Sequence, residues 1–155
     1  DAKLIICEQE TPELGLVGSP TDVNPEVIFT LFENDMIPVI APLGAGNNGE
    51  TLNINGDTVS GAIASALKAD RLLLLTDVSG VQDKNGSIIT ELDSTQIKNW
   101  INEGIISGGM IPKTETALLA LKGGVRGVVI LDGRVPNACL LELFTEHGAG
   151  SLIRA

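Results

Sequence analysis

The sequence predicts an α/β protein, a three-layer α/β/α sandwich with a mainly parallel central sheet. Aliphatic strand candidates alternate with helical patterns along the chain, and this alternation favours parallel strands with helices on both faces. The strand candidates are nearly continuous apolar runs, as in sheets that are buried on both faces. The 155 residues are 43% hydrophobic and 19% charged, which is enough apolar content for a packed core.

The individual elements follow from periodicity and turn residues. Strands are expected at residues 3–7, 14–17, 37–43, 51–54, 71–76, 127–131 and 151–153. Helices are expected at residues 25–32, 57–68, 94–103, 114–122 and 137–145. Asn24 and Ser94 are predicted N-caps, and either Asn55 or Asp57 is predicted to cap the second helix. Residues 84–86 are typical of a hairpin turn.

Charge and cysteine content exclude several classes of function. A net charge of −10 argues against nucleic acid or an anionic membrane as a partner, although it leaves room for a nucleotide. Cys7 and Cys139 have no metal-ligand spacing, and we expect reduced thiols in a cytoplasmic protein. No run is long enough to span a membrane, and the start of the chain has no signal-like segment. His147, the one histidine, is expected at the surface.

A glycine-rich turn at residues 108–113, with the sequence Gly-Gly-Met-Ile-Pro-Lys, is the first candidate site. Gly108 and Gly109 allow a ligand to approach the backbone closely, and Lys113 lies where a helix is expected to begin. A helix N-terminus favours anions, so the backbone N–H groups and the lysine would together suit a phosphate. A plain turn with a solvated lysine is the alternative.

Two further candidate sites follow predicted strands. In α/β folds ligands bind beyond the carboxyl ends of strands. Asn53, Asn55 and Asp57 follow one strand and could bind an acid or amide and orient a lysine, or could merely cap the next helix. Thr76 ends another strand and Asp77 follows it; the two suit ribose hydroxyls, or form an ordinary strand exit. Neither the dinucleotide-binding nor the P-loop signature is present.

Taken in order, these motifs closely resemble the amino-acid kinase family. The segments are N-I-N-G-D at 53–57, L-L-T-D-V-S-G-V at 74–81 and G-G-M-I-P-K at 108–113. The tail at 140–153 is also similar to that family, and the resemblance covers nearly the whole chain from residue 14. It implies phosphorylation of the γ-carboxylate of N-acetyl-L-glutamate by ATP with Mg²⁺, a step of arginine biosynthesis. One alternative is a kinase for a related acid, such as a carrier-bound aminoadipate. The other is a non-catalytic module that binds arginine or a nucleotide.

The resemblance also implies roles for single residues. Asn53 matches a substrate-binding asparagine, with Asn55 beside it, and Asp57 matches an aspartate that holds catalytic lysines in place. Lys113 matches the lysine that stabilises the transferring phosphoryl group. Glu142 and Gly148 match positions of an arginine site, which implies arginine as a feedback inhibitor. Gly56 departs from the alanine common in the family. The implied nucleotide-binding residues are Thr76, Asp77, Val78, Ser79, Gly80, Val81, Gln82, Ile105, Ile106, Ser107, Gly109 and Met110.

The domain organisation implied by the resemblance has two parts. Residues 1–68 correspond to the end of the amino-acid (substrate) domain, and residues 69–155 to the nucleotide-binding domain. The family places another glycine-rich loop and a second catalytic lysine before the matching region, so we expect this chain to be part of an enzyme. We therefore expect it to need a companion chain or to form a homo-oligomer.

Overall fold

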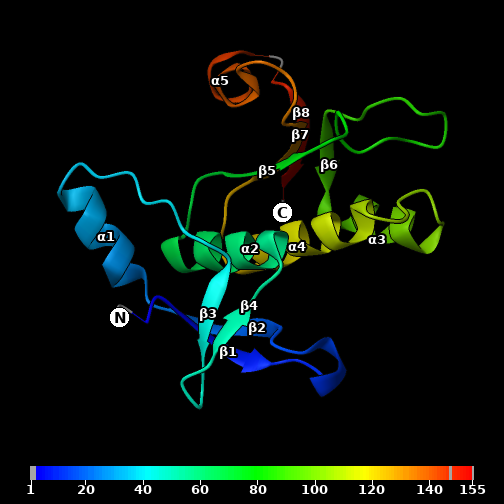
Figure 1. Ribbon diagram of the computed structural model, residues 1–155. Coiled ribbons are helices and arrows are strands. Elements are labelled where there is room, and N and C mark those ends of the chain that lie inside the picture. Colours follow the sequence, from blue (N-terminus) through cyan, green and yellow to red (C-terminus); the bar gives the residue numbers. More distant parts are fainter. Residues whose placement is uncertain (1–2, 147, 155) are drawn as a thin grey trace. The chain divides into compact units, whose positions relative to one another are not determined.

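The computed structural model describes residues 3–146 and 148–154, so His147 lies outside the described residues. It has the predicted α/β class, with helices and strands alternating along the chain (Figure 1). The chain divides into two compact units, Asp1–Leu67 and Lys68–Ala155, and each contains a four-stranded sheet. The substrate and nucleotide roles assigned to residues 1–68 and 69–155 remain predictions.

The first unit is built on the sheet order β2-β1-β3-β4. Its strands are β1 (Ile5–Gln9), β2 (Gly18–Val23), β3 (Leu43–Gly46) and β4 (Thr51–Asn53). Its helices are the 3₁₀ helix η1 (Pro12–Leu14), α1 (Pro25–Glu33) and α2 (Gly56–Leu67). Asn24 caps α1 as predicted, because its side chain accepts a hydrogen bond from the Glu26 N–H at 3.2 Å. The core of this unit joins Ile5, Cys7, Leu52, Ile54 and Val59.

The second unit is built on the sheet order β5-β7-β8-β6. Its strands are β5 (Leu72–Thr76), β6 (Glu91–Asp93), β7 (Val128–Asp132) and β8 (Gly150–Arg154). Its helices are α3 (Ser94–Asn102), α4 (Met110–Lys122) and α5 (Ala138–Phe144). The predicted hairpin turn at 84–86 is confirmed by an antiparallel bridge between Gln82 and Ile88.

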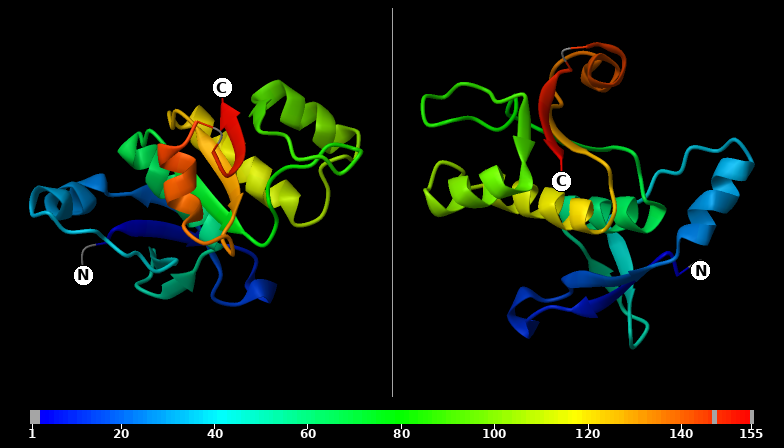
Figure 2. Two further views of the ribbon diagram at one scale, coloured as in Figure 1. Left: turned by 90° about the horizontal axis from the view of Figure 1, so that it is seen from above. Right: turned by 180° about the vertical axis from the view of Figure 1, so that it is seen from behind.

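Helices cover both faces of the second sheet (Figure 2). All five residues of β7 are buried, so this strand forms the centre of the unit. Ala138 of α5 packs against Val129 and Leu131 on one face, while α4 lies along the other face. The second unit therefore has three layers, and its apolar strand is buried on both sides as its sequence predicts.

Both sheets are mixed, whereas the sequence predicted one mainly parallel sheet. The β1–β3, β5–β7 and β6–β8 pairs are parallel, and the β1–β2, β3–β4 and β7–β8 pairs are antiparallel. Only residues 47–50 connect β3 to β4, and so short a connection can join only antiparallel neighbours.

Two predicted strands and one predicted cap are wrong. Residues 14–17 end a 3₁₀ helix and lead into β2, which the sequence did not predict. Residues 37–42 form no strand, and Ile37 and Val39 are 90% and 96% exposed. Asp93 caps α3 in place of Ser94, because its Oδ1 accepts hydrogen bonds from the N–H groups of Thr95 and Gln96. β6, which ends at this aspartate, was also not predicted.

Candidate functional site

A cavity of about 430 Å³ lies in the second unit, where β5 ends and α4 begins. The segment that follows β5 forms one side of the cavity, and the segment that leads into α4 forms another. The lining residues are Thr76, Asp77, Val78, Gly80, Val81, Gln82, Ile105, Ile106, Ser107, Gly109, Met110 and Lys113.

The cavity brings together residues that the sequence placed in separate motifs. Every residue predicted to bind a nucleotide lines it except Ser79, and Lys113 lines it as well. Two segments more than twenty residues apart in sequence therefore share one hollow, as expected for loops at one edge of an α/β sheet. Nucleotide binding by these residues remains a prediction.

The position of Thr76 and Asp77 follows from the register of two buried strands. β5 and β7 pair in parallel from Leu72 with Val128 to Thr76 with Asp132, so both strands end at the same edge. Beyond that edge the chain turns at Gly80 and enters the hairpin that follows, where the Ile89 N–H bonds to the Val81 carbonyl at 2.9 Å. The polar residues after β5 are thus held between a buried strand and a hydrogen-bonded hairpin.

The other side of the cavity is the N-terminus of α4, which begins four residues earlier than predicted. Its N-cap is Gly109, which makes no side-chain capping hydrogen bond. Lys113 therefore lies in the first turn of the helix. The N–H groups of Met110 and Ile111 bond to the carbonyls of Ser107 and Gly108 at 3.2 Å, and Pro112 has no N–H. The N-terminus of a helix nevertheless carries a partial positive charge that favours anions. A cationic side chain and a helix N-terminus meet at this part of the cavity wall, as the glycine turn predicted.

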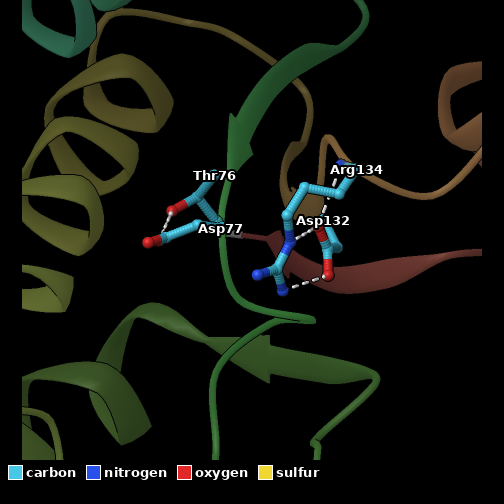
Figure 3. Close-up of polar contacts among 4 residues, drawn as sticks. All are labelled: Thr76, Asp77, Asp132 and Arg134. Atoms are coloured by element: carbon cyan, nitrogen blue, oxygen red, sulfur yellow. Dashed lines mark hydrogen bonds and ion pairs between the residues drawn. The ribbon is translucent and has the colours of Figure 1, made fainter.

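An ion pair that the sequence analysis did not single out lies beside this edge (Figure 3). Asp132, which is 7% exposed, accepts hydrogen bonds from Nε and Nη2 of Arg134 at 2.9 and 2.8 Å. The side-chain hydrogen bonds from Arg134, together with its backbone N–H, lower the pKa of Asp132 to about 2. Thr76 and Asp77 lie on the other side of β5 in this view, with Thr76 Oγ1 donating to Asp77 Oδ1 at 3.3 Å. A signal was available, since Asp132 and Arg134 directly follow a predicted strand.

The predicted substrate residues lie in the first unit, at the end of β4 and the start of α2. Asn53 is the exposed last residue of β4, and its backbone N–H bonds to the Leu16 carbonyl. Asn55 caps α2, because its Oδ1 accepts hydrogen bonds from the N–H groups of Asp57 and Thr58 at 2.9 and 3.2 Å. Asp57 is half-buried in the first turn of α2. The capping role of Asn55 is confirmed, and the substrate roles remain predictions.

Glu142 and Gly148, the predicted arginine-site residues, line a second cavity of about 390 Å³ in the second unit. Oε2 of Glu142 accepts a hydrogen bond from the Ala149 N–H at 2.7 Å, which ties α5 to the segment before β8. Gly148 has a φ of +64°, and a Cβ at this position would lie 2.6 Å from Glu142 Oε2. The cavity wall also contains the Arg154–Glu91 ion pair, with 3.3 Å between Nε and Oε1.

Within the described residues, neither a metal-ligand cluster nor a membrane-spanning helix is present. No three His, Cys, Asp or Glu side chains within residues 3–146 and 148–154 are grouped so that they could hold a metal ion. Within the same ranges, no helix combines the length and the apolar character that crossing a membrane requires.

The chain is similar over nearly its whole length to several known proteins. The acetylglutamate kinase of Ruegeria pomeroyi is 68% identical over 154 residues, which are 99% of this chain and 54% of that protein. The solved structure of smu.665 from Streptococcus mutans UA159 is 35% identical, with a TM-score of 0.82, and the match covers 98% of this chain and 57% of that one. An N-acetylglutamate synthase structure from Neisseria gonorrhoeae, 22% identical with a TM-score of 0.91, shares the fold over 99% of this chain and 37% of its own.

The match to the family extends over most of the chain. The chain spans about half the length of the curated relatives it matches. The model of the amino acid kinase family matches residues 1–132, which include both units' candidate residues up to the end of β7. The chain belongs to the amino acid kinase family.

Proposed function

We propose that this chain is the nucleotide-binding part, and part of the substrate site, of an enzyme that phosphorylates the γ-carboxylate of N-acetyl-L-glutamate with ATP. The observation that carries the proposal is the cavity in the second unit, where Lys113 and the first turn of α4 meet the Thr76–Asp77 segment. Relatives that are 66–68% identical and named acetylglutamate kinase support the choice of acid. The reaction would be a step of arginine biosynthesis.

The chemistry needs little from the protein beyond placement and charge. The acceptor carboxylate is already ionised, so no strong general base is required, and catalysis rests on positioning and on neutralising the moving phosphoryl group. Lys113 would supply positive charge to the phosphate oxygens, and the partial positive charge of the α4 N-terminus would add to it.

The charged groups of the cavity fit ATP that carries its own magnesium. Asp77 is the one carboxylate among the lining residues, and Mg²⁺ in kinases is commonly held by one or two carboxylates together with substrate phosphates. When bound, the ion would neutralise part of the charge on those phosphates. Thr76 and Asp77 would then meet the nucleotide beside the metal or at its ribose.

On the substrate side, we propose that Asn53 binds the acyl-amino acid. Its amide can both donate and accept hydrogen bonds, as recognition of an acetamido group or a carboxylate requires. Asn55 would contribute by fixing the start of α2, because its Oδ1 already accepts two backbone hydrogen bonds. Asp57, in the first turn of that helix, would orient catalytic lysines.

We further propose that the second cavity takes arginine as a feedback inhibitor. Its wall carries charges of both signs: the carboxylates of Glu91, Glu142 and Glu146, and the guanidinium groups of Arg71 and Arg154. A guanidinium side chain would pair with the carboxylates, and the carboxylate end of the ligand would pair with an arginine of the wall.

Calorimetric titration of the chain with MgATP and with AMP tests the nucleotide site. We expect Lys113→Ala to weaken MgATP binding ~10- to 100-fold, the effect of losing a charge-assisted hydrogen bond, and to leave AMP binding nearly unchanged. Asp77→Ala should weaken nucleotide binding, while Asn53→Ala, a variant in the other unit, should not. Equal losses for MgATP and AMP in Lys113→Ala would refute the placement of the lysine at the phosphates.

A further inference from the structure

A buried serine hydroxyl outside the cavity at β5 and α4 forms a hydrogen bond with a residue of the cavity wall. Ser151, in β8, is 0% exposed, and its Oγ accepts a hydrogen bond from the Val81 N–H at 2.8 Å. Val81 is 1% exposed and lines the cavity, whereas Ser151 is not among the lining residues. A residue near the end of the chain therefore fixes the backbone of the segment that follows β5.

The turn formed by Gly80 and Val81 packs closely against Ser151. Gly80 has a φ of +149°, a conformation that residues with a side chain rarely adopt. A Cβ on Gly80 would lie 2.5 Å from Ser151 Oγ and 3.3 Å from the Ser151 backbone nitrogen. The turn at Gly80 therefore packs directly against Ser151, and its backbone conformation requires a small side chain at position 151.

The same region is tied down by backbone hydrogen bonds. The Val81 carbonyl accepts from the Ile89 N–H, and the Leu152 N–H donates to the Thr90 carbonyl, both at 2.9 Å. Val81 is therefore held on one side by the hairpin and on the other by β8. Of these bonds, only the one to Ser151 depends on a side chain, so a single substitution can remove it and leave the backbone pairing in place.

We propose that Ser151 is a positioning residue for nucleotide binding: its hydroxyl holds the Gly80–Val81 turn in the conformation that shapes the cavity. This inference rests on the proposed nucleotide function of that cavity. Without Oγ, the Val81 N–H would be buried without an acceptor, and a turn that loses such a bond shifts toward conformations that satisfy it elsewhere. Ser151 acts through Val81 and does not touch the ligand.

Titration of the 155-residue chain with MgATP tests the proposal in three variants. Ser151→Ala removes the acceptor, and Ser151→Cys keeps a side chain of similar size whose sulfur accepts hydrogen bonds only weakly. We expect both to weaken binding about five- to tenfold, the effect of one buried hydrogen bond. The matched control is Ser65→Ala, which removes a part-buried hydroxyl that bonds to the Gly61 carbonyl in the other unit, and it should bind like the wild type.

Hydrogen exchange gives a second readout that needs no nucleotide. In Ser151→Ala, the Val81 amide should exchange at least tenfold faster, while the Leu72 amide, bonded to the Gly127 carbonyl between β5 and β7, should keep its rate. Equal acceleration of both amides would indicate loss of global stability and would overturn a local role. Trp100, the single tryptophan, lies in α3 and reports by its fluorescence whether this unit is folded.

The outcomes separate this inference from the proposed function. If wild type binds MgATP and both Ser151 variants bind equally well, the positioning role is wrong and the nucleotide site stands. If Ser151→Cys binds normally and Ser151→Ala does not, the serine only fills space and the hydrogen-bond role is wrong. If wild type binds no nucleotide, the proposed site is refuted, together with the functional part of this inference, and exchange at Val81 then reports only on the hydrogen bond.

Discussion

Replacement of Gly80 by alanine should destabilise the second unit strongly. Two costs combine at this position. Alanine at a φ of +149° adopts a sparsely populated backbone conformation, which costs ~1–3 kcal/mol. The new Cβ would also lie 2.5 Å from Ser151 Oγ and 3.3 Å from Ile88 Cγ2, and such overpacking costs a further ~1–3 kcal/mol. The sum, ~2–6 kcal/mol, is a large part of the ~5–15 kcal/mol that stabilises a typical domain.

Two companion variants separate these costs. Gly86→Ala carries the backbone cost alone, because Gly86 has a φ of +81° and nothing lies within 4 Å of an added Cβ. It should cost only ~1–2 kcal/mol. In the double variant Gly80→Ala with Ser151→Ala, the overlapping oxygen is gone, so the loss should be smaller than the sum of the single losses by ~1–2 kcal/mol.

Urea unfolding followed by the fluorescence of Trp100 measures these differences in the second unit. The order of stability should be wild type, then Gly86→Ala, then Gly80→Ala. The reasoning is refuted if Gly80→Ala loses no more than Gly86→Ala, or if the double variant loses the full sum. Either result would mean that the turn at Gly80 is not packed as closely against Ser151 of β8 as in the structure.

Two further predictions concern other parts of the molecule. The hydrogen bonds from Arg134 hold the pKa of Asp132 at about 2, below its ordinary 3.8, so the stability from this pair is present above pH 3.8 and is lost as the pH falls toward 2. The gap in melting temperature between wild type and Asp132→Asn should therefore narrow over that window, and a gap that stays constant from pH 5 to pH 2 would contradict the assignment. In the first unit, we expect exposed Ile37 and Val39 to promote self-association or binding of a companion chain. Sedimentation velocity should show association that Val39→Ser weakens, and a monomer at every concentration, with no companion chain bound, would contradict this.

The sequence was most informative where a local rule and a topological rule agreed. Thr76 and Asp77 follow an aliphatic run, and Lys113 follows two glycines at the start of a helical pattern, so each motif could be placed at a strand or helix end from its neighbours alone. The rule that ligands bind beyond the carboxyl ends of strands then placed both motifs at one edge. The cavity between them follows from those two steps.

Ser151 and the Asp132–Arg134 pair could not be predicted in the same way. The Ser151–Val81 bond joins residues seventy positions apart and exists because β8 pairs antiparallel with β7, a register that no local pattern in the sequence specifies. From the sequence alone, a serine in a short apolar strand indicates only that a small residue is tolerated there. Asp132 and Arg134 were visible as polar residues after a strand, but their pairing depends on a tight turn at Gly133, whose N–H bonds to the Thr76 carbonyl.

The apolar run at residues 37–43 shows the limit of reading burial from composition. An aliphatic segment predicts a buried strand because such residues are usually buried, yet a strand also needs a neighbour to accept its hydrogen bonds. In the described part of the first unit, only Leu43 of this run enters the sheet, where β3 pairs with β1 and β4. Pro38 and Pro42 donate no backbone hydrogen bond, and residues 38–41 instead line a cleft of about 460 Å³ together with Leu4, Ile5 and Leu31. The exposed Ile37 and Val39 have the composition of a core strand without the neighbours that would bury it, which is why this segment, rather than the charged faces of the helices, is where we expect another chain to bind.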